Sequence, residues 1–193
     1  MLTKIADGIV QLLERRGIID PQSRDVYVYG CDAALSTLIN TAGLLLVGVI
    51  CHRVLEAMII IGLFYLNQST GGGFHASTHL RCFLTMAIGL LGAILTYSIY
   101  LDFLFLFLLG FLSLVLLYRY PLVLHANKTY LADKSAVFIR RSRLTICIQA
   151  IFLFAAATFF QHDFFQALTV GLTLCAVSRA VAVYIDRLAK KPC

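Results

Sequence analysis

The residues best suited to chemistry lie between positions 67 and 82, where the sequence is NQSTGGGFHASTHLRC. The three glycines at 71–73 allow the backbone to bend sharply and to approach a ligand closely, and their amides are candidate donors to an oxyanion. His75 follows them, and Cys82 comes seven residues later, which is about two turns of a helix. An imidazole can take the proton from a thiol, and the thiolate can then attack a peptide carbonyl. This stretch is therefore a candidate cysteine peptidase site.

Spacing alone leaves other interpretations of the same stretch open. His79 lies three residues before Cys82 and is a second candidate for the base. His75, His79 and Cys82 together also have a plausible spacing for metal ligands. A single His and a single Cys in a loop can, moreover, be purely structural.

The composition indicates a membrane protein, whose transmembrane helices would position the candidate site. The chain has 193 residues, is 60% hydrophobic and only 13% charged, and has a mean hydropathy of +0.87. Soluble domains carry about 25% charged residues, so this chain has too little polar surface for a soluble globule. We expect an all-α integral membrane protein with a single domain, residues 1–193. The net charge of +6 is carried in short segments between apolar runs, so nucleic acid is not expected as a partner.

Six apolar runs predict about six transmembrane helices within residues 33–185. The runs are 33–50, 54–66, 83–100, 103–118, 144–160 and 164–184. Residues 1–32 precede them, and within this segment Leu and Ile recur at helical spacing up to Ile19, which predicts an amphipathic interfacial helix. Asp20 and Pro21 are expected to stop that helix and to begin a second, short one. Asp102, the only charge between the third and fourth runs, predicts a tight hairpin.

The distribution of basic residues predicts the topology. With the N-terminus inside, six crossings place residues 1–32, the catalytic loop 67–82, the basic loop 119–143 and the C-terminal tail in the cytoplasm. Those segments contain all but Arg53 of the 16 Lys and Arg residues, with Arg179 counted in the tail. We expect a multi-pass protein of the cell membrane with both termini cytoplasmic. No charge is expected at the middle of a span, which argues against a transporter.

The six cysteines, at positions 31, 51, 82, 147, 175 and 193, have no paired spacing, and several fall within apolar runs. We therefore expect reduced thiols rather than a disulfide framework. Neither a bound metal nor another cofactor is predicted.

Three stretches resemble a known family. The sequence Gly72-Gly73-Phe74-His75-Ala76 followed by Cys82 is similar to the signature of the accessory gene regulator B (AgrB) family, membrane cysteine endopeptidases that process quorum-sensing propeptides. Residues of the basic loop and of the segment before the first crossing agree in order and spacing. These are Pro121, His125, Asn127, Lys128, Arg140 and Arg141 in the loop, and Tyr27, Tyr29 and Gly30 before the crossing. The resemblance covers nearly the whole chain.

The resemblance implies that His75 and Cys82 are the catalytic pair and that His79 is not. It implies an AgrD-like propeptide substrate with an amphipathic start, a central cysteine or serine and an acidic tail, which is cut through an acyl-enzyme thioester and cyclised to a thiolactone or lactone. Candidate substrate contacts are Gly72, Gly73, Arg81, His125, Asn127, Lys128, Arg140 and Arg141. Membrane lipid and a second copy in a homodimer are further candidate partners. A peptide exporter and a metal-binding membrane protein remain as alternatives.

One feature departs from the family pattern. Family members commonly carry basic residues just before the glycine pair, whereas this chain has Asn67, Gln68, Ser69 and Thr70 there. The departure leaves substrate recognition open and does not affect the pair of residues proposed for the chemistry.

Overall fold

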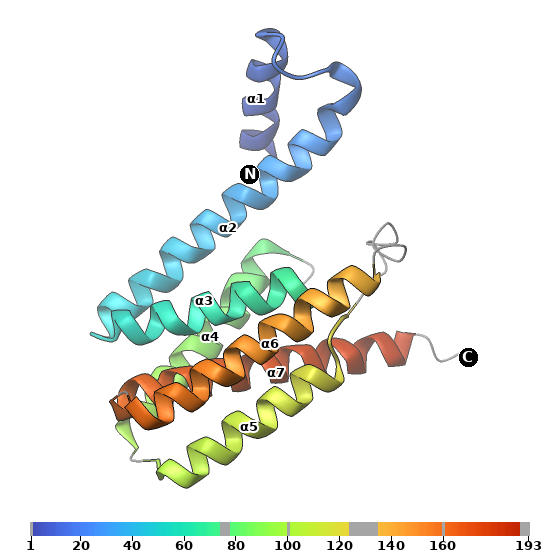
Figure 1. Ribbon diagram of the computed structural model, residues 1–193. Helices are drawn as coiled ribbons and strands as arrows, with labels where there is room; N and C mark the ends of the chain where they lie inside the picture. Colours follow the sequence, from blue (N-terminus) through green and yellow to red (C-terminus); the bar gives the residue numbers. More distant parts are fainter. Residues whose placement is uncertain (1, 74–77, 100, 124–134, 160, 190–193) are drawn as a thin grey trace. The chain divides into compact units, whose positions relative to one another are not determined.

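The protein is helical throughout the part that the structure describes (Figure 1). The computed structural model describes residues 2–73, 78–99, 101–123, 135–159 and 161–189. Helices and short connections account for these residues, with no strand among them, which confirms the all-α prediction. By its internal contacts the chain divides into two compact units, Met1–Leu46 and Val47–Cys193.

The first unit begins with the amphipathic helix that the sequence predicts, but this helix ends earlier than expected. Helix α1 (Leu2–Arg15) stops before the Asp20–Pro21 pair. Gly17 has a φ of 67°, a left-handed conformation that glycine adopts without steric cost, and its amide donates to the carbonyl of Glu14 at 2.9 Å. The prediction that Asp20 and Pro21 stop the helix is therefore wrong, because a glycine C-cap ends it first.

Asp20 has the capping role that was predicted for it. Its carboxylate accepts the amide of Gln22 at 3.0 Å at the start of the 3-10 helix η1 (Pro21–Ser23), which leads directly into α2 (Arg24–Ile50). The first apolar run therefore lies in a longer helix than the run itself.

Helix α1 separates small and large apolar residues between its faces. Ala6 and Val10 are buried, whereas three larger apolar side chains are exposed: Ile5, Ile9 and Leu12. Arg24 at the start of α2 forms an ion pair with Asp7 of α1 at 2.7 Å. An exposed apolar face beside charged residues is typical of helices that lie at a membrane surface.

The second unit contains the remaining helices, and each of the other five apolar runs falls largely within one of them. They are α3 (Val54–Gly71), α4 (His79–Leu95), the 3-10 helix η2 (Thr96–Ser98), α5 (Phe103–Arg119), α6 (Ser135–Phe159) and α7 (His162–Ala189). Asp102 lies in the short connection between η2 and α5, and its carboxylate caps α5 by accepting the amide of Leu104 at 2.9 Å.

Four helical segments are long and apolar enough to cross a membrane. They are Pro21–Ile50, Leu80–Ser98, Ser135–Phe159 and His162–Leu188. Helix α5 is apolar but shorter, and α3 is not among the four. The structure therefore supports a membrane protein with four candidate spans, and the predicted number of six is not confirmed.

Helix α7 is the central helix of the second unit. Half of its most apolar stretch is buried, compared with 17% for the corresponding stretch of α4. Glycines allow close packing in this unit: a Cβ atom at Gly171 of α7 would lie 2.8 Å from a methyl carbon of Leu63 of α3, and one at Gly110 of α5 would lie 2.8 Å from a methyl carbon of Leu153 of α6. Small residues at such crossings let membrane helices approach closely. The core formed by α5, α6 and α7 thereby supports the ends of the helices, where the site lies.

The outer faces of these helices carry many large apolar side chains that the described residues leave exposed. Ile88 of α4, Phe111 of α5 and Ile151 of α6 are each more than half exposed. A water-soluble protein rarely exposes so much apolar surface, whereas lipid chains cover it without cost. The exposure therefore agrees with the membrane location that the composition predicts.

Candidate active site

Cys82 lies in the first turn of α4. The helix begins at His79, and Thr78 is its N-cap: the Thr78 hydroxyl accepts the amide of Arg81 at 3.3 Å, and the Thr78 carbonyl accepts the amide of Cys82 at 3.0 Å. Cys82 is half-buried and is a free thiol. Thr78 was not among the residues predicted from the sequence, although a threonine just before a helix is a common N-cap signal.

The three glycines form a turn that packs against the beginning of the basic loop. Helix α3 ends at Gly71, and Gly72 follows with a φ of 71°. The amide of Val123 donates to the carbonyl of Gly71 at 2.9 Å. A Cβ atom at Gly71 would lie 2.6 Å from the carbonyl oxygen of Pro121, and one at Gly72 would lie 2.8 Å from that of Val123. The glycines therefore do permit a close backbone approach, and the partner is the segment Pro121–Val123 of the same chain.

This packing restricts what the glycine amides can do. The amide of Gly72 already donates to the carbonyl of Gln68 at 3.1 Å, as the C-cap of α3. In this conformation Gly72 is not available as an oxyanion donor, contrary to the expectation from the sequence. Its contact with Val123 instead brings together two of the stretches that carry the family resemblance, the glycine motif and the basic loop.

A buried arginine lies directly beside the glycine turn. Arg179 of α7 is only 2% exposed, and its guanidinium donates to the carbonyl of Asn67 at 3.0 Å. It also donates to the carbonyl of Tyr120 at 3.3 Å, to the hydroxyl of Ser142 at 3.4 Å and to the carbonyl of Leu117 at 3.5 Å. One cation thus joins α7 to α6 and to the C-terminal ends of α3 and α5.

One prediction about Arg179 is wrong. It does not belong to the C-terminal tail but lies within α7, in the candidate span His162–Leu188 and nearer to the C-terminal end of that span than to its start. A signal was present, because Arg179 falls inside the sixth apolar run, where an ionisable residue points to function. Within the described residues, Arg179 donates its hydrogen bonds to oxygens of the protein itself. Its presence in a span is therefore not evidence for a transport pathway.

Some of the remaining predicted site residues lie in helices, and the others fall outside the described residues. Arg81 is exposed in the first turn of α4, and Arg140 and Arg141 lie near the start of α6. His75, His125, Asn127 and Lys128 lie outside the described residues, as does the side chain of His79. The choice between His75 and His79 as the base, and the metal-site alternative that includes both, therefore stay as the sequence left them.

Arginine and tyrosine side chains gather where α5 ends. Arg119 and Arg187 lie over the ring of Tyr120, with guanidinium carbons 5.5 and 5.8 Å from its centroid, and Arg143 lies 5.3 Å from the centroid of Tyr118. These distances are within the range of a cation–π interaction. The backbone carbonyl of Tyr120 also accepts a hydrogen bond from Arg179, which lies beside the glycine turn. The group of arginines around Tyr118 and Tyr120 therefore begins next to that turn. Arg119, Arg143 and Arg187 were not among the site residues predicted from the sequence.

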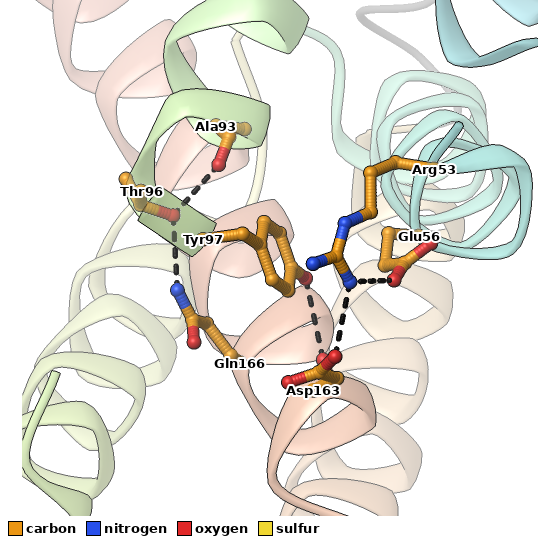
Figure 2. Close-up of polar contacts among 7 residues, drawn as sticks. All are labelled: Arg53, Glu56, Ala93, Thr96, Tyr97, Asp163 and Gln166. Carbon is orange, nitrogen blue, oxygen red and sulfur yellow. Dashed lines mark hydrogen bonds and ion pairs between the residues drawn. The ribbon is translucent and has the colours of Figure 1, made fainter. Parts of the chain in front are cut away.

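The other end of α3 has a different electrostatic character. Arg53, just before α3, pairs with Glu56 at 2.8 Å and with Asp163 of α7 at 3.0 Å, and its guanidinium lies 4.8 Å from the ring centroid of Tyr97 (Figure 2). The hydrogen bonds to Glu56 and then to Asp163 raise the pKa of Arg53 above its ordinary value, so it stays cationic. The one basic residue predicted to lie outside the cytoplasm is thus held by two carboxylates.

Further hydrogen bonds extend this cluster to the end of α4. Figure 2 shows the side-chain amide of Gln166 donating to the hydroxyl of Thr96 at 3.1 Å and that hydroxyl donating to the carbonyl of Ala93 at 2.6 Å. The hydroxyl of Tyr97 donates to the backbone carbonyl of Asp163 at 3.2 Å. These contacts fix α7 to the end of α4 and give this end a structural role.

Comparison with known proteins identifies one family. A sequence model of the family described as AgrB, accessory gene regulator B, matches residues 4–179 of the 193. The matched range includes the glycine turn, Cys82 and Arg179. Neither the curated proteins nor the solved structures gave a match to this chain.

Proposed function

Because the chain belongs to the accessory gene regulator B family, which takes part in peptide processing, we propose that it is a membrane-embedded cysteine endopeptidase. Its substrate is an AgrD-like propeptide, and its product is the precursor of a cyclic autoinducing peptide for quorum sensing. The observation that carries the proposal is the position of Cys82. A half-buried free thiol in the first turn of a helix, directly after the glycine and histidine motif, suits a nucleophile.

In the first step, His75 takes the proton of the Cys82 thiol, and the thiolate sulfur attacks the carbonyl carbon before the acidic tail. The carbon–nitrogen bond breaks, and the protonated His75 gives its proton to the leaving amine. The upstream fragment stays on Cys82 as a thioester.

In the second step, the propeptide's own cysteine or serine attacks that thioester. A proton returns to the sulfur of Cys82, and the ring closes as a thiolactone or lactone. Exchange of one thioester for another is close to isoenergetic, so the ring accumulates only if water is kept from the intermediate. The apolar surfaces beside the start of α4, including the exposed Leu80 and Leu84, agree with a site at the membrane boundary that excludes water.

Recognition of the acidic tail is assigned to the basic residues on the same side of the membrane. Arg81, Arg140 and Arg141 from the described residues, together with His125, Asn127 and Lys128 of the basic loop, form this proposed contact surface. Each surface charge contributes modestly and is screened by salt, so binding of the tail should weaken as ionic strength rises.

A trapped intermediate tests the function directly. A propeptide whose ring-closing cysteine or serine is replaced by alanine cannot resolve the thioester by exchange. With this substrate we expect the wild-type protein to accumulate an adduct, seen by mass spectrometry, that hydroxylamine removes. Replacing the other five cysteines together serves as the control and should leave the adduct intact. Normal cleavage by a Cys82→Ala variant would exclude a cysteine peptidase.

The same proposal places both termini in the cytoplasm, because the basic residues outside the Arg53 cluster lie on one side of the predicted layout. Single-cysteine variants that retain only Cys51 or only Cys193 test this orientation. We expect a membrane-impermeant maleimide added to intact cells to label Cys51, next to Arg53, and to leave Cys193 unlabelled. Labelling of both cysteines from outside would contradict the proposed topology.

A further inference from the structure

The guanidinium of Arg179 donates hydrogen bonds at the end of α5, where the backbone lacks an N–H donor. In an α-helix the carbonyl of Leu117 would accept the amide of the residue four positions later, which here is Pro121 and has no N–H. The guanidinium of Arg179 donates to that carbonyl and to the carbonyl of Tyr120 just beyond α5. The C-terminal end of α5 is therefore completed by a side chain from α7.

The same guanidinium also holds the end of α3. Its second terminal nitrogen donates to the carbonyl of Asn67 at 3.0 Å, in the last turns of that helix. The C-terminal end of a helix carries partial negative charge, so a cation between two such ends is favourably placed. The planar fork of arginine can bind several oxygens at once, which a lysine ammonium cannot do with the same geometry.

Gly71 is the point at which Arg179 meets the glycine turn. A Cβ atom at Gly71 would collide with a terminal nitrogen of Arg179, so the backbone of the turn lies directly against the guanidinium. From Gly71 the chain runs through Gly73 to His75 within four residues. Whatever fixes Gly71 therefore fixes the start of the segment that carries the proposed base.

We propose that Arg179 is a positioning residue for the reaction: it holds the turn Gly71–Gly73 against Pro121–Val123 and so sets the approach of His75 to Cys82. This inference rests on the proposed peptidase function. It assigns no contact with substrate to Arg179, which acts through the glycine turn.

Arg179→Gln and the milder Arg179→Lys test the assignment in proteoliposomes with the propeptide. We expect kcat to fall by about 100-fold in Arg179→Gln, as for a small misplacement of reacting groups, while KM changes little. Ser142→Ala removes only one hydrogen-bond partner of the guanidinium and should lower kcat about two- to tenfold. A large rise in KM with kcat preserved would overturn the assignment.

Thr173→Val is the matched control. It removes a partly buried hydrogen bond between the hydroxyls of Thr173 in α7 and Ser113 in α5, 3.1 Å apart, without touching the glycine turn. We expect it to lower thermal stability but to leave kcat near the wild-type value. If Thr173→Val and Arg179→Gln lost kcat equally, the effect of Arg179 would be general destabilisation, and the proposal would fail.

The rate at which iodoacetamide alkylates Cys82 at neutral pH tests whether Arg179 acts through His75 or independently of it. If Arg179 acts through His75, Arg179→Gln should slow alkylation to the rate of His75→Ala, and the double variant should be no slower than either. Independent, multiplied losses in the double variant would contradict a role through His75.

Hydrogen exchange at the amide of Val123 tests the positioning role of Arg179 separately from the peptidase function. That amide donates to Gly71, so it should exchange faster in Arg179→Gln than in the wild type or in Thr173→Val. Unchanged exchange would overturn the positioning role even if the protein is a peptidase. If His75→Ala left cleavage and alkylation unchanged, the peptidase mechanism would fail instead, whatever Val123 shows.

Discussion

His75→Ala is expected to abolish cleavage of the propeptide, whereas His79→Ala should retain most of it. A free thiol is only a few per cent thiolate at neutral pH, so loss of the base removes most of the nucleophile and also the acid that protonates the leaving amine. General acid–base catalysis contributes on the order of 10²- to 10⁴-fold, which sets the size of the expected loss. Steady-state cleavage of the propeptide by the two single variants is the measurement.

His79→Ala is a suitable control because His79 is the first residue of α4 and alanine is a good helix former. The cap of that helix is supplied by Thr78, which the substitution leaves in place. Loss of cleavage in His79→Ala with cleavage retained in His75→Ala would assign the base to His79. Loss in both variants together with sensitivity to a chelator would favour the metal-site alternative.

Gly71→Ala is expected to eliminate activity and to lower the thermal stability of the protein. The added methyl group would lie 2.6 Å from the carbonyl oxygen of Pro121 and would overlap the guanidinium of Arg179. Neither neighbour is free to move, because Arg179 is bound to four protein oxygens and the segment after Pro121 is hydrogen-bonded through Val123. Overpacking of this kind costs about 1–3 kcal/mol and would displace the turn that leads to His75.

Gly62→Ala in the same helix is the matched control. A Cβ atom at Gly62 meets nothing within 4 Å, so the substitution should be neutral or should stabilise α3 by up to about 1 kcal/mol. Thermal unfolding in detergent and propeptide cleavage should be measured for both variants. Equal behaviour of Gly71→Ala and Gly62→Ala would show that the close contacts at the glycine turn do not matter for the protein.

The features that the sequence predicted correctly are encoded locally or in composition. The apolar runs predicted the helices, and Asp20 was predicted to cap a short helix, which it does by accepting the amide of Gln22, two residues away. The resemblance carried by the glycine motif and Cys82 predicted the family, which the match over residues 4–179 confirms. The end of α1 is encoded just as locally, by the left-handed conformation of Gly17, although the predicted end was at Asp20 and Pro21.

The number of spans could not be obtained in the same way. The second and fourth apolar runs mark real helices, α3 and α5, but neither is among the four that are long and apolar enough to cross a membrane. A run of apolar residues indicates burial without saying whether lipid or protein covers it.

The sequence by itself determined the membrane class, the helices and the candidate nucleophile, because composition, periodicity and a short motif are properties of neighbouring residues. Only the tertiary structure decided the role of Arg179, whose hydrogen-bond partners are 37 to 112 positions away along the chain. It likewise decided why Gly71 must be glycine and why Arg53 pairs with Asp163, 110 positions away. Such contacts depend on which helix faces meet, and helical spacing identifies a buried face without identifying the helix that packs against it.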